Sequence, residues 1–286
     1  MLHDRQGTVK GFETLNEDYQ GKIPLLSYFS VAYEKLGDPA AEIDNEFRSI
    51  EVRPDRLQNQ LTVGLSDKDP SSTSDRLRYR VVHADVPPSA VANTVRAQRG
   101  DLTAVEVVRV LKMTEYQVFP NVWAPILAGF RIGLVDTEDR QLYSLGFMER
   151  RIATSASDDR GIYAGLTCHI PFELGLPDRR IDWDVEYALL DNNFLIDVNT
   201  NAGPSVRVVT GSATGSTIIP IPELAGPTPC VLIISRFRFA FTNGHHEVRR
   251  IAVGQKPGTT DLEVAFHDKN ADDPFDYEVS YALLNI

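Results

Sequence analysis

The residues best suited to hold a metal ion lie in an acidic turn near the end of the chain. Residues 268–273 read Asp-Lys-Asn-Ala-Asp-Asp, so Asp268, Asn270 and Asp272 offer oxygen atoms at alternate positions. Hard cations such as calcium bind several oxygen ligands from one loop. The sixth and twelfth positions of this run lack the glycine and the glutamate of an EF-hand. We therefore expect a solvated hairpin turn, with a calcium site as the alternative.

Three histidines and one tryptophan are the other candidates for contact with a ligand or partner. His245 and His246 follow Asn-Gly, and adjacent residues of a strand point to opposite faces, so these imidazoles are poorly placed to share one metal ion. His267 directly precedes the acidic turn, and Trp123 stands between two prolines before a predicted strand. We expect the histidine pair in a surface turn and the indole in the core, with a binding groove as the alternative for Trp123.

The sequence motifs that identify many enzymes are missing. The chain holds no Gly-x-Ser-x-Gly elbow and no glycine-rich phosphate loop between a strand and a helix. Its two cysteines, Cys168 and Cys230, are too few for a structural zinc site, and we expect buried thiols rather than a disulfide. We therefore expect no catalytic residues, and no cofactor apart from the calcium considered above.

One pattern recurs near the end of each third of the chain. Tyr79, Trp183 and Tyr277 are each followed by valine two positions later and by alanine three positions after that. Apolar and polar residues alternate through all three segments. This period of two predicts a half-buried strand in each third.

Two further blocks recur upstream of that strand. Phe29, Phe130 and Phe237 each stand in a run whose alternate residues are apolar, which again predicts a strand. A later block spaces its apolar residues by three and then by two, which indicates one extra residue in a strand, as at a β-bulge. These apolar residues are Phe47, Ile50 and Val52, then Leu142, Leu145 and Phe147, then Val248, Ile251 and Val253.

Blocks in one order, three times over, predict an all-β protein of three tandem repeats, each a small antiparallel β-sandwich of jelly-roll-like form. The expected units are residues 1–90, 91–195 and 196–286. Strands with one apolar face must cover that face with another sheet. The pattern leaves open whether each unit forms its own sandwich or the three pack as one pseudo-threefold body.

Composition and charge exclude several classes of partner. The 286-residue chain has a net charge of −11 and no basic patch, which disfavours binding to nucleic acid. No run approaches the roughly 18 apolar residues of a membrane helix. The polar start is unlike a secretory signal, so we expect synthesis in the cytoplasm and a final place there or in a released particle.

Tandem β units without a catalytic motif favour a structural function. We expect a non-enzymatic scaffold or docking component of a larger, phage-like or exported particle, with protein partners or self-assembly. The alternative is a lectin-like module that binds a glycan or another ligand, assisted by calcium. Retention on sugar resins separates this alternative from a scaffold, which elutes within a large assembly.

Overall fold

The computed structural model confirms the all-β, antiparallel fold class. Within the part of the chain it describes, the helical segments are two short 3-10 turns, η2 (Asn192–Phe194) and η3 (Pro222–Ala225), and no helix has the length and apolar character that a membrane crossing needs. The described residues are 3–9, 11–19, 21–33, 47–67, 75–84, 91–97, 102–103, 107–112, 123–135, 141–142, 144–152, 161–169, 180–196, 206–243, 246–268 and 273–286.

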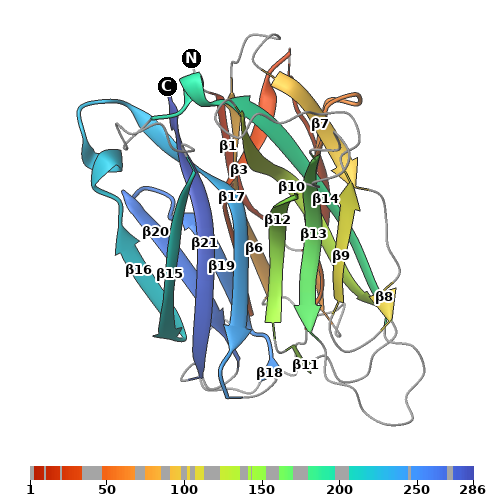
Figure 1. The fold of residues 1–286 in the computed structure, drawn as a ribbon. Coiled ribbons are helices and arrows are strands. Elements are labelled where there is room, and N and C mark those ends of the chain that lie inside the picture. The colour runs from red at the N-terminus through yellow and green to blue at the C-terminus, as the bar shows by residue number, and fades with distance from the viewer. Residues whose placement is uncertain are drawn as a thin grey trace.

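Three large sheets, called A, B and C, contain most of the strands (Figure 1). In spatial order, sheet A consists of β1 (His3–Val9), β6 (Asp75–Ala84), β3 (Ile23–Tyr33), β19 (Arg250–Gln255), β20 (Asp261–His267) and β16 (Ser216–Pro220). Sheet B consists of β2 (Phe12–Asn16), β5 (Gln60–Asp67), β4 (Phe47–Asp55), β10 (Trp123–Val135), β14 (Arg180–Asp191) and β7 (Val91–Ala97), with β8 (Leu102–Thr103) also against β14. Sheet C consists of β15 (Arg207–Thr214), β21 (Pro274–Asn285), β17 (Cys230–Phe241), β12 (Ser144–Ile152), β13 (Gly161–His169) and β9 (Val107–Lys112). Two short strands, β11 (Gln141–Leu142) and β18 (His246–Glu247), pair with each other.

Each large sheet joins strands from two of the three predicted units, which we call thirds. The junction strands are β3 and β19 in sheet A, β4 and β10 in sheet B, and β12 and β17 in sheet C. These three junctions, called seams, are antiparallel ladders of five, four and four residue pairs. Among the described strands, no sheet is therefore built from one third alone.

The strands follow one order in all three large sheets. We number the six longer strands of each third along the chain, leaving out the two-residue strands. Every large sheet then contains the first, sixth and third strands of one third, followed by the fourth, fifth and second strands of another. Both chain ends lie at the same end of the molecule (Figure 1).

Three phenylalanines from the three sheets meet in the core. The ring centroid of Phe29 lies 4.8 Å from that of Phe130 and 5.4 Å from that of Phe237, and the last two are 6.4 Å apart. All three side chains are buried, and they belong to one apolar cluster that includes residues from sheets A, B and C. The predicted apolar faces of these three strands thus pack together in one common core.

The strands that carry these phenylalanines share a register shift. The pairing shifts between Leu26 and Tyr28 in β3, between Leu127 and Gly129 in β10, and between Ile234 and Arg236 in β17. A β-bulge of this kind moves the following side chains to the other face. In β3, β10 and β17 the described side chains before the bulge are mostly buried on both faces. Because the bulge exchanges the two faces, one face of this first half contributes to a second apolar cluster. That cluster includes Ile23, Leu25, Ala124, Ile126, Val231 and Ile233.

The spacing of three and then two has different structural causes in different thirds. In β4 the register shifts between Phe47 and Ser49, which confirms the predicted bulge. In the last third the strand is interrupted instead, because β18 ends at Glu247 and β19 begins at Arg250. Val248 lies in that interruption and is still buried. The apolar pattern therefore indicated burial correctly, but it did not distinguish a bulge from a break.

Candidate functional site

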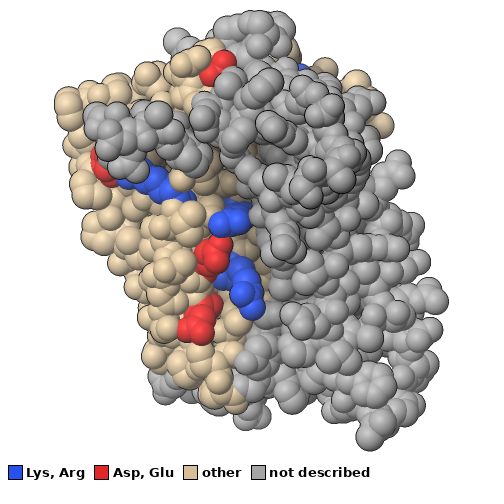
Figure 2. All heavy atoms as spheres, viewed as in Figure 1, with Lys and Arg blue, Asp and Glu red and all other residues tan. Residues whose placement is uncertain are grey.

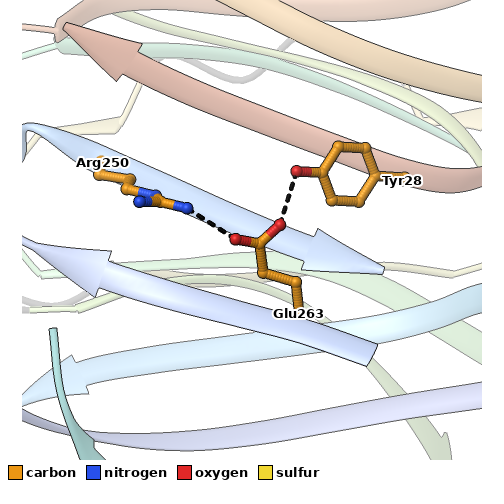
Figure 3. A network of polar contacts seen from close by, with 3 residues as sticks. All are labelled: Tyr28, Arg250 and Glu263. Carbon is orange, nitrogen blue, oxygen red and sulfur yellow. Dashed lines mark hydrogen bonds and ion pairs between the residues drawn. The ribbon is translucent and has the colours of Figure 1, made fainter. Parts of the chain in front are cut away.

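A buried polar network crosses the seam of sheet A (Figure 3). Gly254 on β19 pairs with Tyr28 of β3 on one side and with Glu263 of β20 on the other. The tyrosine hydroxyl donates a hydrogen bond of 2.8 Å to Oε2 of Glu263. Arg250 donates from Nη2 to the other carboxylate oxygen, Oε1, at 2.6 Å. Glycine has no side chain to separate the two neighbours, so they meet above it.

The backbone at Gly254 also requires glycine. Its φ is +118°, a region that residues with a side chain rarely adopt. A Cβ atom there would lie 2.1 Å from the carbonyl oxygen of Ser27, well inside van der Waals contact. Ser27 is at the bulge of β3, so the close approach and the bulge occur together at this seam.

The chemistry of this network is that of an ion pair in which both carboxylate oxygens of Glu263 accept hydrogen bonds, while Nε of Arg250 is buried without a hydrogen-bond partner among the described residues. Burial raises the pKa of Tyr28, and the neighbouring carboxylate of Glu263 raises it further, so the phenol stays protonated and donates. Each carboxylate oxygen has a donor, and Arg250 balances the negative charge. Hydrogen bonds between buried polar groups favour one arrangement of the strands that carry them. The arrangement therefore suits a tie between the first and last thirds.

A second arginine spans the seam of sheet B. Nε of Arg53 on β4 lies 2.7 Å from a carboxylate oxygen of Glu51, and its Nη1 lies 3.5 Å from one of Asp184 on β14. Strand β10 lies between β4 and β14. A Cβ atom on Gly129 of β10 would lie 2.5 Å from the carbonyl oxygen of Val52 and 3.2 Å from Cα of Arg53. This glycine therefore allows both the close packing and the crossing of the arginine.

The outer face of sheet C carries charges of both signs. Figure 2 shows blue and red side chains alternating over the region of β17 and β21. Arg236 donates from Nε to the hydroxyl of Ser280 at 2.8 Å, and its Nη2 lies 2.8 Å from a carboxylate oxygen of Glu278. Arg207, at the start of β15, pairs with Glu223 of η3 at 3.0 Å. Ion pairs at this degree of exposure contribute about 0–1 kcal/mol each, so they shape the face more than they stabilise the fold.

A buried aromatic pair lies in the first third. The ring of Tyr19 lies 4.9 Å from that of His83, and both side chains are almost fully buried. The tyrosine hydroxyl donates to the carbonyl of Gln60 at 3.1 Å. Burial raises the pKa of Tyr19, with further contributions from the carboxylates of Glu17, Glu186 and Asp55. The phenol is therefore held in its neutral form.

The residues that the sequence singled out lie partly inside and partly outside the described segments. Asp268 directly follows β20 and is buried, while Asn270, Asp272 and His245 lie outside the described residues. The backbones of the other candidates are described, but their side chains are not. Trp123 begins β10 opposite Asp191, His246 of β18 pairs with Leu142, and His267 of β20 pairs with Arg250. The calcium site and the ligand groove stay predictions.

One of the two cysteines is described in full. The Cys230 thiol is free and donates to the carbonyl of Glu223 at 3.5 Å. Burial raises the pKa of this thiol, and the nearby Glu223 carboxylate adds to the effect. Both influences keep it protonated. The sequence predicted a buried thiol, and Cys230 is half-buried.

Sequence reasoning missed Tyr28, Glu263 and Arg53. A signal was present in the last third, where Glu263 stands between two apolar residues in the middle of a predicted strand. A period-two pattern assigns such a residue to the solvent face. Here that face is buried, and Glu263 is 3% exposed.

Comparison with known proteins finds no family model that matches the chain and no curated protein whose sequence matches it.

Proposed function

We propose that this protein is a non-enzymatic structural component of a larger assembly, made of three tandem β units that close into one pseudo-threefold body. The observation that carries the proposal is the shared strand order of sheets A, B and C. The three subunits of a trimer, joined edge to edge, would produce the same cyclic arrangement, in which each subunit places half of its strands in a sheet shared with one neighbour and half in a sheet shared with the other. A single chain with this order offers the symmetry of a trimer without needing three subunits.

Local details at matching strand positions support the tandem units. Tyr79 of the first third lies over Gly7, where an added Cβ atom would be 2.7 Å from the hydroxyl oxygen. Tyr277 of the last third lies over Gly211 in the same way, at 2.5 Å. Both tyrosines belong to the recurring aromatic-x-Val segment, and both glycines are on the first strand of their third. An aromatic ring that covers a strand glycine shields the backbone there.

The corner between the first two strands repeats as well. Gly11 follows β1 with a φ of +65°, and Gly215 follows β15 with a φ of +67°. The carbonyl of Gly11 accepts from the backbone N–H of Leu65, and that of Gly215 accepts from Phe266. In the first and last thirds this glycine turns the chain from one large sheet into another. The corner thus closes one side of each of these two units.

The three seams favour one body over three separate sandwiches. Strands of different thirds are hydrogen-bonded at every seam, and Phe29, Phe130 and Phe237 pack together at the centre. A rigid body with threefold character suits a part that docks on a threefold or sixfold particle. The partners are then other proteins or further copies of the chain.

The test is native purification from the source of the protein, followed by size-exclusion chromatography with light scattering and identification of co-eluting proteins. We expect the chain in a complex of several times its own mass and in a fixed ratio to defined partners. A matched sample in dissociating salt should release the free chain. A lone monomer in the native extract that is retained on sugar resin would reject the proposal in favour of the lectin-like alternative.

A further inference from the structure

One border of the molecule consists of two edge strands joined by a single glycine. Strand β15 is the outermost described strand of sheet C and pairs with β21, and β16 is the outermost of sheet A and pairs with β20. Gly215 connects them. Residues 207–220 therefore form one continuous border, which we call the 207–220 border. The alternate side chains of both strands are exposed along its whole length.

The 207–220 border is uncharged after its first residue. Residues 208–220 contain no Asp, Glu, Lys or Arg, although 24% of the whole chain is charged. Two exposed apolar side chains are on it, Val208 at 52% exposure and Ile218 at 45%. The sequence is rich in the β-branched residues Val, Ile and Thr, which favour strand pairing.

The other edge strands carry charges within their length. Arg5 lies in β1, Glu13 in β2, Arg96 in β7 and Arg109 in β9. Charged residues on an edge strand oppose pairing with another chain, and natural sheets use them for that purpose. The 207–220 border lacks this protection, so within the described part of the chain the outward backbone groups of its strands are open to a further strand.

We infer that the 207–220 border is an assembly surface, on which β15 of a second copy of this chain pairs antiparallel with β15. The molecule already joins its own thirds by antiparallel edge pairing, with ladders of only four or five residue pairs. Strand β15 offers eight residues for the same kind of contact. An uncharged strand is also compatible with itself, because a twofold contact places the same residues on both sides.

The charges at the two ends of β15 select the antiparallel direction. At the first end, Arg207 is neutralised by Glu223. At the other end, Ser212 and Thr214 pair with Asp276 and Pro274 of β21, next to Asp273. Parallel pairing of two copies would bring the two acidic ends together. Antiparallel pairing keeps the acidic ends apart. This lowers the electrostatic repulsion between two copies of a chain with a net charge of −11.

This inference rests on the proposed function, since it names one contact of the assembly. Its test is light scattering and sedimentation of the purified full chain over a range of concentrations. We expect a reversible dimer for the wild type. The double variant Val208→Lys with Thr210→Lys puts four positive charges at the contact and should raise the dissociation constant about tenfold or more. Thr8→Lys, an exposed position on edge strand β1, is the matched control and should leave it unchanged.

A second measurement does not depend on any variant. Amide hydrogen exchange of residues 208–214 should slow as the wild-type concentration rises, while exchange in β1 should not change. A wild type that stays monomeric at all concentrations, or equal weakening by Thr8→Lys, overturns the inference. If the purified chain is a monomer but the native protein is found in a particle, the β15 contact is rejected and the proposed function stands. If the chain forms the dimer but no particle is found, the contact stands and the proposed function is rejected.

Discussion

Tyr28 and Glu263 are 235 positions apart in the chain, yet the hydroxyl of one donates to the carboxylate of the other across Gly254. The two residues belong to the first and last thirds, so this hydrogen bond ties the beginning of the chain to its end. Replacing Tyr28 by Phe leaves a buried carboxylate oxygen without its donor. We expect a loss of about 1–3 kcal/mol in the free energy of unfolding, measured by urea denaturation.

The control for this variant removes the same atom from another tyrosine. Tyr277→Phe deletes a hydroxyl that lies over Gly211 and has no role in a seam. We expect a change within about 0.5 kcal/mol. Equal losses for the two variants would mean that the hydrogen bond to Glu263 does not stabilise the seam.

Tyrosine ionisation predicts a loss of stability in alkali. Burial raises the folded-state pKa of both Tyr28 and Tyr19 above the ordinary value, so the unfolded chain loses these protons at a lower pH than the folded chain does. Their contribution is complete below about pH 10 and declines as the pH rises further. Each such tyrosine should lower the free energy of unfolding by about 1.4 kcal/mol per pH unit in that range.

Urea denaturation at a series of pH values between neutral and strongly alkaline measures this slope. Tyr28→Phe should make this slope shallower by the contribution of one tyrosine. Phenolate absorbance gives a second readout, because buried tyrosines ionise only as the protein unfolds. A slope that Tyr28→Phe leaves unchanged would contradict the assignment.

The sequence predicted well where the strands lie in the chain, but not which strands pair with one another in a sheet. Phe29, Phe130 and Phe237 were expected on apolar strand faces, and the structure buries all three in one core. Period-two alternation indicates which face of a strand is apolar, but not which strand lies beside it. The seams therefore could not be read from the pattern, because each joins strands from different thirds.

The polar network was missed for a related physical reason. A carboxylate in the middle of a strand is read as solvent-exposed unless a partner is known, and the partners of Glu263 come from two other strands. Gly254 itself gave no signal, since its role depends on the backbone of Ser27 in another third. The acidic turn that the sequence predicted, residues 268–273, lies mostly outside the described residues.

Gly254→Ala should open the seam of sheet A. The new methyl group would collide with the carbonyl of Ser27, and the φ of +118° disfavours any side chain. We expect the free energy of unfolding to fall by more than about 3 kcal/mol, and thermal unfolding measures this loss. Gly258→Ala is the matched control, because its φ is +77° but nothing lies within 4 Å of an added Cβ atom. That variant should lose only about 1–2 kcal/mol, and a similar loss for both would discount the close approach.

The acidic turn is tested by calcium removal. We expect the same thermal midpoint with calcium and with a chelator, since the run lacks the glycine and the glutamate of an EF-hand. Asp268→Ala should lower the midpoint equally in both conditions, because Asp268 is buried. A midpoint that rises with calcium in the wild type and not in Asp272→Ala would overturn this expectation and establish a metal site.

Phe237→Ala tests whether the three thirds unfold together. The side chain is buried against Phe29 and Phe130, so its loss should lower the free energy of unfolding by about 3–5 kcal/mol. Leu57→Ala, at a side chain that is 98% exposed, should change it by less than about 0.5 kcal/mol. If the core is shared, calorimetry of wild type and variant should give one transition, with equal calorimetric and van't Hoff enthalpies. Separate sandwiches would instead give several transitions, of which Phe237→Ala shifts only the one that belongs to the last third.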